Sequence, residues 1–242
     1  MTIRGKHPAN GAEPEVVDLG VIHDLLNPLT SIVGNLDLLD ELLAGAALPA
    51  AQRRLGDGLA SAEELRSMLE NLRYLMAGDS RGPLPHEPLE LPRMLEQLQQ
   101  SVQARGLVKH PIELRLPAES VPFVPGGEDL LRRAADVLLR TAARIGTRIT
   151  IELQCTAGGE IEVRFVHQGR TLPAILVGRL LEPDFPQVQS EQGVKIDRGR
   201  GLWFARTVIE AHHGSLRYEP RGDGGSFVAR LPAEHDKNRF DL

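Results

Sequence analysis

The stretch IHDLLNPLTSIVGNLDLLDELL, residues 22–43, places an apolar side chain at every third or fourth position. This spacing is typical of an amphipathic helix with a near-heptad apolar stripe. Residues 44–49 (AGAALP) interrupt the pattern, so the helix is expected to end there. The apolar stripe consists of Ile22, Leu25, Leu26, Leu29, Ile32, Val33, Leu36, Leu39, Leu42 and Leu43.

A second helical pattern runs from Leu55 to Met76 and stops before Gly78. Two long helices with a short connection pack as an antiparallel hairpin. One hairpin leaves much of its apolar stripe uncovered. We favour a second copy as the cover, in a dimeric four-helix bundle formed through residues 18–78. The alternative is that the stripe packs on the chain's own second half.

The sequence after this hairpin predicts an α+β layer. The expected organisation is a disordered lead (1–13), the hairpin (14–78), a linker rich in Pro and Gly (79–90), a second domain (91–235) and a tail (236–242). In the second domain, helices are predicted at 91–105, 127–145 and 200–213. Strands are predicted at 112–116, 148–154, 160–167, 215–219 and 226–231.

Composition narrows the class of protein further. The 242 residues contain one cysteine, which excludes a disulfide scaffold and is typical of a reducing compartment. No apolar run is long enough to span a membrane, and residues 1–15 do not resemble a signal peptide. The net charge of −5, without a basic block, argues against a nucleic-acid partner. We therefore expect a cytoplasmic protein.

Polar residues accompany the apolar stripe near the start of the first helix. His23, Asn27 and Thr30 are spaced by four and three, which places them on one outward stripe. An exposed imidazole is a competent nucleophile toward phosphorus. Asp24 can accept the ring proton or fix the tautomer, and Asn27 can bind a phosphoryl oxygen or orient a water. On its own, His23 would be interpreted as an ordinary surface histidine.

The run from His23 to Leu29 is more specific than its single residues. It resembles the H-box of sensor histidine kinases, whose pattern is His-acidic-x-x-Asn-Pro-Leu. In that family the histidine is phosphorylated, the acidic neighbour assists as a base, and the Asn or Thr one turn on supports dephosphorylation. The resemblance therefore implies that His23, Asp24 and Asn27 are the catalytic residues. The dimeric hairpin of that family also agrees with the helices predicted above.

Residues 91–232 are similar to the ATP-binding domain of the same kinases, which belongs to the GHKL superfamily. The resemblance implies an α/β sandwich of that type. Its closing segment matches the family pattern GxGLGLA…VEAHGG…GxGTxF…LP. The matching positions are Gly199, Gly201, Leu202, Ala205, Val208, Ile209, Glu210, Ala211, His212, Gly214, Gly222–Phe227, Leu231 and Pro232.

The positions that would handle ATP depart from this family. Val137 and Thr141 stand where two asparagines would supply a side-chain amide for Mg²⁺. His167 stands where the motif DxGxG places an aspartate on the adenine amino group. Gly169 keeps the first glycine of that motif, and Thr171 replaces the second. A missing acceptor at a buried adenine weakens base discrimination.

A third departure is Trp203, which stands where the last glycine motif has a small residue. Residues 182–198, in addition, resemble a remodelled lid. Losses at three motifs, with the fold-defining residues kept, predict that the domain binds no ATP productively, and neither cofactor nor metal is expected. Gly199 and Gly201 are then interpreted as backbone turns. His212 and His213 close a helix, where a cation suits the dipole.

A phosphorylatable histidine without ATP chemistry must obtain its phosphoryl group from another protein. The first hypothesis is a histidine phosphotransferase of a bacterial two-component phosphorelay, which exchanges phosphate between His23 and the aspartates of response-regulator receiver domains. The second is an active ATP-dependent histidine kinase with an unusual nucleotide site. The third is a non-catalytic scaffold or a phosphatase that acts on a response regulator.

Overall fold

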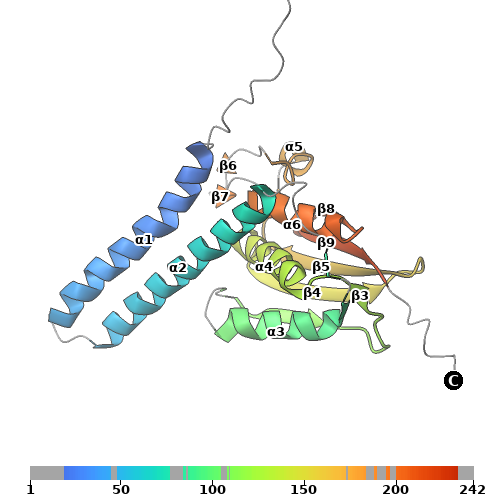
Figure 1. The fold of residues 1–242 in the computed structure, drawn as a ribbon, viewed down its shortest axis with the longest axis horizontal. Helices are drawn as coiled ribbons and strands as arrows, with labels where there is room; N and C mark the ends of the chain where they lie inside the picture. The colour runs from blue at the N-terminus through green and yellow to red at the C-terminus, as the bar shows by residue number, and fades with distance from the viewer. Residues whose placement is uncertain are drawn as a thin grey trace, which may run out of the picture.

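The structure is a computed structural model that describes residues 19–44, 48–76, 84–85, 87–104, 108, 110–172, 174–183, 188–189, 195–196 and 200–233. Helices α1 (Leu19–Ala44) and α2 (Leu48–Met76) form the predicted antiparallel hairpin (Figure 1). The predicted lead at 1–13, the tail at 236–242 and most of the predicted lid lie outside the described residues.

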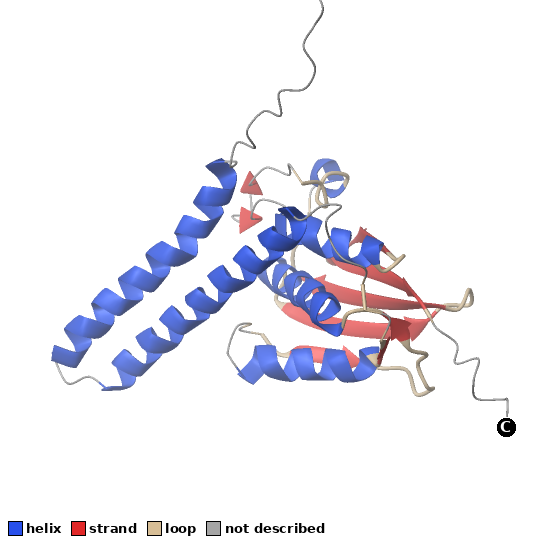
Figure 2. Ribbon diagram, in the orientation of Figure 1, coloured by secondary structure: helices blue, strands red, loops and turns tan. Residues whose placement is uncertain are grey.

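The second domain has the predicted α+β class, with a mixed five-stranded sheet in the order β2-β4-β5-β9-β8 (Figure 2). Strands β2 and β4 are parallel, and the other neighbours are antiparallel. The elements are β1 (Pro88–Leu89), α3 (Leu91–Ala104), β2 (Ile112–Arg115), β3 (Val124–Pro125), α4 (Glu128–Ile145), β4 (Arg148–Cys155), β5 (Glu160–Gln168), α5 (Ala174–Val177), β6 (Val188–Gln189), β7 (Lys195–Ile196), α6 (Arg200–Ala211), β8 (Ser215–Arg221) and β9 (Gly224–Pro232).

Helices α3, α4 and α6 cover one face of this sheet (Figure 1). Side chains alternate along β5, so Ile161, Val163 and Phe165 point into the core that the helices share. Helix α4 buries Leu131, Leu138 and other residues of its 3.6-residue repeat on the same core. The apolar periodicity read from the sequence therefore sets which face of each element is buried.

The opposite face of the sheet carries an ionic network around Glu162, whose side chain is only 1% exposed. Arg230 and Arg164 donate hydrogen bonds to its carboxylate at 2.7 and 2.6 Å, and Gln154 donates a third at 2.8 Å. Burial alone would raise the pKa of Glu162, but these donors outweigh it and hold the pKa below its usual value. The buried carboxylate is therefore ionised and fully paired.

His212, just after the end of α6, is hydrogen-bonded to the residue that precedes α4. Gly127 donates its backbone N–H to Nε2 of His212 at 3.2 Å, and the other ring nitrogen lies 2.7 Å from the Val208 carbonyl oxygen. Burial lowers the pKa of His212, so its ring is neutral at pH 7. The expectation that His212 acts as a cation on the helix dipole is therefore wrong for this residue. His213 is exposed and ends the helix with a left-handed φ of 58°.

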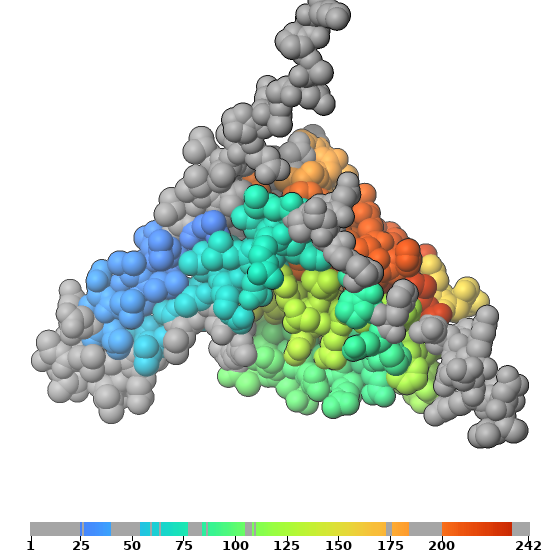
Figure 3. Space-filling model, viewed as in Figure 1, coloured from blue at the N-terminus to red at the C-terminus, as the bar shows by residue number. Residues whose placement is uncertain are grey.

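The hairpin and the second domain meet along α2 (Figure 3). Arg133 of α4 donates two hydrogen bonds, at 3.1 and 2.7 Å, to Oδ1 of Asn71, which is 7% exposed. The guanidinium of Arg133 also lies 5.1 Å from the ring centroid of Phe204. Tyr74 of α2 packs edge-on against that Phe204 ring at 5.6 Å. These contacts dock the second domain on the hairpin.

Part of the α1 stripe stays uncovered in the single chain. Leu29, Val33 and Leu36 are 44%, 50% and 51% exposed. The alternative in which the stripe packs on the chain's own second half is therefore wrong at these positions. Exposed apolar stripes of this kind are typical of surfaces that take part in protein contacts.

Candidate functional site

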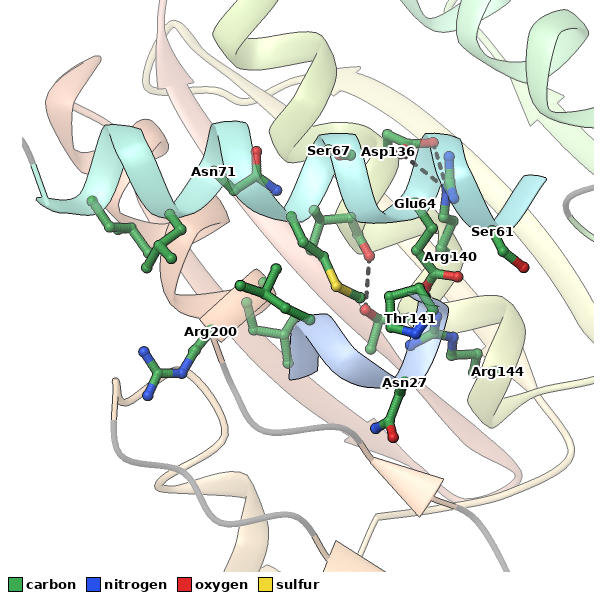
Figure 4. A pocket seen from close by; sticks show the side chains of 18 of the residues that line it. Asn27, Ser61, Glu64, Ser67, Asn71, Asp136, Arg140, Thr141, Arg144 and Arg200 are labelled. Carbon is green, nitrogen blue, oxygen red and sulfur yellow. Dashed lines mark hydrogen bonds and ion pairs between the residues drawn. The ribbon is translucent and has the colours of Figure 1, made fainter. Parts of the chain in front are cut away.

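A cavity of about 370 Å³ lies where the hairpin meets the second domain (Figure 4). We call it the interdomain cavity. Helices α1 and α2 form one side of it, and α4 with the start of α6 forms the other. Its lining residues are Leu25, Asn27, Pro28, Ser31, Ser61, Glu64, Ser67, Met68, Asn71, Leu72, Leu75, Asp136, Val137, Arg140, Thr141, Arg144, Ile145, Arg200, Gly201 and Leu202.

The predicted catalytic residues His23, Asp24 and Asn27 lie in the second and third turns of α1. Asn27 is exposed and lines the cavity, and Pro28 beside it is buried. His23 and Asp24 belong to the same helix, but their side chains lie outside the described residues. Because residues four apart occupy one face of a helix, the backbone of His23 lies one turn from Asn27 on the same side of α1.

The two α4 positions that the sequence singled out also line the cavity. Val137 presents an apolar side chain there. Thr141 donates its hydroxyl to the carbonyl oxygen of Val137 at 2.7 Å, a bond within its own helix. An isopropyl group and a hydroxyl bonded in this way do not form an oxygen ligand set for Mg²⁺.

Charged side chains of α4 reach the cavity beside these two residues. Arg140 pairs with Asp136 one turn earlier at 2.9 Å. Arg144 pairs across the interface with Glu64 of α2 at 2.5 Å. Arg140, Glu64 and the buried Asn71 line the cavity as well, although the sequence pattern does not single them out. The only signal available was that polar residues interrupt the apolar repeats of these helices, which is also typical of any surface.

His167 lies apart from the interdomain cavity, at the end of β5 and inside the core. It is 1% exposed, and its Nε2 atom lies 2.9 Å from the hydroxyl of Tyr218, while its Nδ1 atom has no hydrogen-bond partner. Burial lowers the pKa of His167 to about 4, so the imidazole is neutral at pH 7. Burial likewise raises the pKa of Tyr218 to about 12. The two rings are stacked, with centroids 5.8 Å apart.

The other predicted site residues lie either after the end of β5, near His167, or at the interdomain cavity. Gly169 follows β5 with φ of 115°, a left-handed conformation that favours glycine. Thr171 is exposed nearby. Gly201 instead lies inside α6, where a Cβ atom would come within 3.3 Å of Val137. Its interpretation as a turn is wrong, because close helix packing is what requires the glycine. Gly199 lies outside the described residues.

Trp203 is partly buried and packs against the core from α6. Among the described residues, no three His, Cys, Asp or Glu side chains cluster so that they could hold a metal ion. None of the helices searched within the described part of the chain is both long and apolar enough to cross a membrane.

Residues 126–235 match the family model "Histidine kinase-, DNA gyrase B-, and HSP90-like ATPase". The chain is 29% identical over 213 residues to the sensor protein CutS of Streptomyces coelicolor, covering 86% of this chain and 50% of CutS. It is 28% identical over 238 residues to the sensor protein VanSC of Enterococcus gallinarum, covering 96% of this chain and 64% of VanSC. Residues 126–235 thus match a GHKL-type ATPase domain, and the chain is similar in sequence to the core of sensor histidine kinases. It spans about half to two thirds of the length of these relatives.

Solved structures of histidine kinases share this fold. Acinetobacter baumannii histidine kinase AdeS superposes with a TM-score of 0.60 at 18% identity, covering 88% of this chain and 98% of that one. Histidine kinase ThkA, crystallised in complex with the response regulator protein TrrA, gives 0.59 at 17% identity, covering 88% of this chain and 60% of that one. The interdomain cavity thus lies between the hairpin and the domain that matches the GHKL model.

Proposed function

We propose that this chain acts in two-component signalling as a histidine phosphotransferase, with His23 carrying the phosphoryl group and receiver domains as its partners. The observation that carries the proposal is the H-box pattern on α1, with Asn27 exposed at the edge of the interdomain cavity. A partner that docks on α1 beside Asn27 would meet the backbone turn that carries His23, since residues four apart share one face of a helix.

The chemistry requires little from the protein beyond these residues. A neutral ring nitrogen of His23 attacks the phosphorus of a receiver's aspartyl phosphate, the bond from phosphorus to the carboxylate oxygen breaks, and the carboxylate leaves. Asp24 accepts the proton or the hydrogen bond of the other ring nitrogen. Asn27 donates to a phosphoryl oxygen. The same steps in reverse pass the phosphoryl group to a second receiver.

Three observations support a receiver rather than ATP as the phosphoryl donor. Val137 offers no ligand atom for Mg²⁺, and the Thr141 hydroxyl is bonded to its own helix. His167 stands where the family has a carboxylate for adenine, and it is buried in the core with its Nε2 atom against the hydroxyl of Tyr218. A magnesium nucleotide does not fit this residue set, and we assign it no step.

An ATP-dependent kinase is the second candidate, and the names of the relatives favour it. The GHKL model covers 110 residues of this chain, from 126 to 235. A probable sensor histidine kinase of Mycobacterium tuberculosis, TcrY, is 26% identical over 88% of the chain. Mg-ATP binding therefore separates the two candidates.

The deciding experiment offers the purified chain two phosphoryl donors separately, radiolabelled ATP with Mg²⁺ and radiolabelled receiver domains from the same genome. Label acquired from a receiver and absent in His23→Ala is the expected result. Label acquired from ATP alone, together with micromolar Mg-ATP binding in calorimetry, would establish the kinase. Receiver dephosphorylation that survives in His23→Ala and disappears in Asn27→Ala would establish a phosphatase. Wild-type signalling by His23→Ala in cells, without either activity, would establish a scaffold.

We further propose that the chain is a homodimer through residues 18–78. The exposed side chains Leu29, Val33 and Leu36 supply the apolar surface for a second hairpin. Light scattering after gel filtration is expected to give the dimer mass for the wild type and the monomer mass for Val33→Asp. Asp37→Asn, on the same helix, is the matched control and is expected to remain dimeric. A monomeric wild type would refute the dimer and leave the phosphotransfer proposal standing.

A further inference from the structure

The side-chain amide of Asn71 brings a hydrogen-bond donor to the wall of the interdomain cavity. Arg133 donates two hydrogen bonds, at 3.1 and 2.7 Å, to one atom of this amide, and an atom that accepts from two donors has to be the oxygen. Asn71 lines the cavity and Arg133 does not. The oxygen is therefore engaged outside the cavity, which leaves the nitrogen as the end of the amide that faces the lining (Figure 4).

This nitrogen is a donor in search of an acceptor. Asn71 is 7% exposed, so its amide is largely removed from water. Among the residues that the structure describes, none accepts a hydrogen bond from the Asn71 nitrogen. A buried donor without a partner costs free energy, and a ligand that offers an acceptor recovers it. Ser67, one turn earlier on α2, lines the cavity as well and adds a hydroxyl beside the amide.

The rest of the lining near this donor is apolar. Met68, Leu72 and Leu75 of α2 and Val137 and Ile145 of α4 contribute their side chains. Leu75 and Ile145 are 7% and 2% exposed, so the apolar lining continues into the hydrophobic core. An apolar body placed between the two helices would leave water and gain contacts on both sides. The volume of about 370 Å³ and the position between two domains are typical of small-molecule pockets.

The charged side chains of the lining already have partners. Arg140 pairs with Asp136, and Arg144 pairs with Glu64. Arg200, at the start of α6, is likewise engaged in an interaction. An acidic ligand would therefore lose its water without finding a spare cation, and burial of an unpaired charge is costly. The lining favours a neutral ligand.

We propose that the interdomain cavity binds a small neutral molecule, with an apolar body between α2 and α4 and a carbonyl-type acceptor on the amide nitrogen of Asn71. The lining comes from α1, α2, α4 and α6, so the ligand contacts both the hairpin and the second domain. It binds where the two are docked, and its binding shifts the chain toward that arrangement. The site is regulatory, and it does not depend on which donor phosphorylates His23.

The first test uses Prodan, a neutral naphthalene that carries a dimethylamino group and a propionyl group and whose emission shifts to the blue when it leaves water. Its comparison is propyl-dimethylaminonaphthalene, in which a methylene replaces the carbonyl. We expect the wild-type chain to bind Prodan about tenfold more tightly than the comparison, because only Prodan has an acceptor for Asn71. Equal affinity for the two, or tighter binding of the anionic anilinonaphthalenesulfonate than of Prodan, would overturn the proposal.

Asn71→Asp separates the donor from the docking contact. The carboxylate keeps an oxygen for Arg133, so the two domains stay docked, but it replaces the amide nitrogen with an acceptor. We expect this variant to bind Prodan and the comparison probe equally. Asn35→Asp places the same group on α1 outside the lining and is the matched control, expected to keep the wild-type preference. Small-angle scattering checks that both variants are as compact as the wild type. A wild-type preference in a compact Asn71→Asp would refute the role of the amide.

Filling the cavity tests the place of binding independently of Asn71. Ser67→Phe puts a ring inside the cavity and is expected to weaken Prodan binding by about tenfold or more. Ala62→Phe adds the same ring at an exposed position of α2 and is expected to bind as the wild type does. Circular dichroism checks that both fold, and Thr141→Phe fills the cavity from α4 if Ser67→Phe does not fold. Undiminished binding in the filled variants would overturn the proposal. Displacement of Prodan by Mg-ATP would overturn it too, because it would assign the cavity to a nucleotide.

Discussion

The hydroxyl of Tyr218 lies 2.9 Å from Nε2 of His167, and the two rings stack inside the core of the GHKL domain. The ordinary value of 6.5 for a histidine pKa falls to about 4 here because the ring is buried. The folded domain therefore holds a neutral imidazole that an unfolded chain would protonate in mild acid.

Acid should destabilise this domain through His167. Between pH 6.5 and about 4 the unfolded chain binds a proton at this residue and the folded chain does not, so the free energy of unfolding falls as the pH falls. The difference between the unfolded and the folded pKa of His167 corresponds to about 3 kcal/mol of unfolding free energy at most. Urea unfolding at pH 7 and pH 4.5 measures it. His167→Gln should lose less stability than the wild type between these two values, and exposed His213→Asn should match the wild type. An identical loss in all three proteins would contradict the prediction.

Glu162 should be required for the stability of the sheet. Glu162→Gln removes the charge that pairs Arg164 and Arg230 at a site where the carboxylate is 1% exposed. Breaking a buried ion pair leaves uncompensated charge, and we expect a loss of about 2–4 kcal/mol in the free energy of unfolding. Guanidinium denaturation followed by circular dichroism provides the measurement. Glu113→Gln, which removes an exposed partner of Arg115, is the control and should change little.

Asn71 should hold the GHKL domain on the hairpin. Asn71→Ala deletes both hydrogen bonds from Arg133 and leaves that guanidinium without them, at a cost of about 1–3 kcal/mol in docking. Small-angle scattering should then report a larger radius of gyration, with the secondary structure unchanged. Asn35→Ala on α1 is the control. A variant as compact as the wild type would show that Arg133 does not secure the interface.

Gly126 should tolerate no side chain. A Cβ atom there would lie 2.2 Å from Cδ2 of His212, inside the link between α4 and α6. Gly126→Ala must displace that ring, and we expect a loss of about 1–3 kcal/mol. Gly222→Ala, where a Cβ would meet nothing within 4 Å, should keep the wild-type melting temperature. Equal melting temperatures for the two variants would show that the ring moves at no cost.

Most of the elements could be predicted from the sequence, because each is set by a local repeat. Alternation at 160–167 predicts a strand that is β5 in the structure, and the stripe after Ile22 predicts α1. The charge state of His212 could not be predicted, since a helix end is locally the same whether a neighbour buries it or not. Pairs such as Arg144 with Glu64 join residues 80 apart, and only the docked domains bring them together.

Glu64 and Asn71 are seven positions apart on α2, about two full turns, so both contacts with α4 lie on a single line along that helix. A rotation of α2 about its own axis would carry both side chains off their partners in one movement, whereas a bend would spare one of them. The attachment of the GHKL domain is therefore more sensitive to torsion of α2 about its own axis than to bending of that helix.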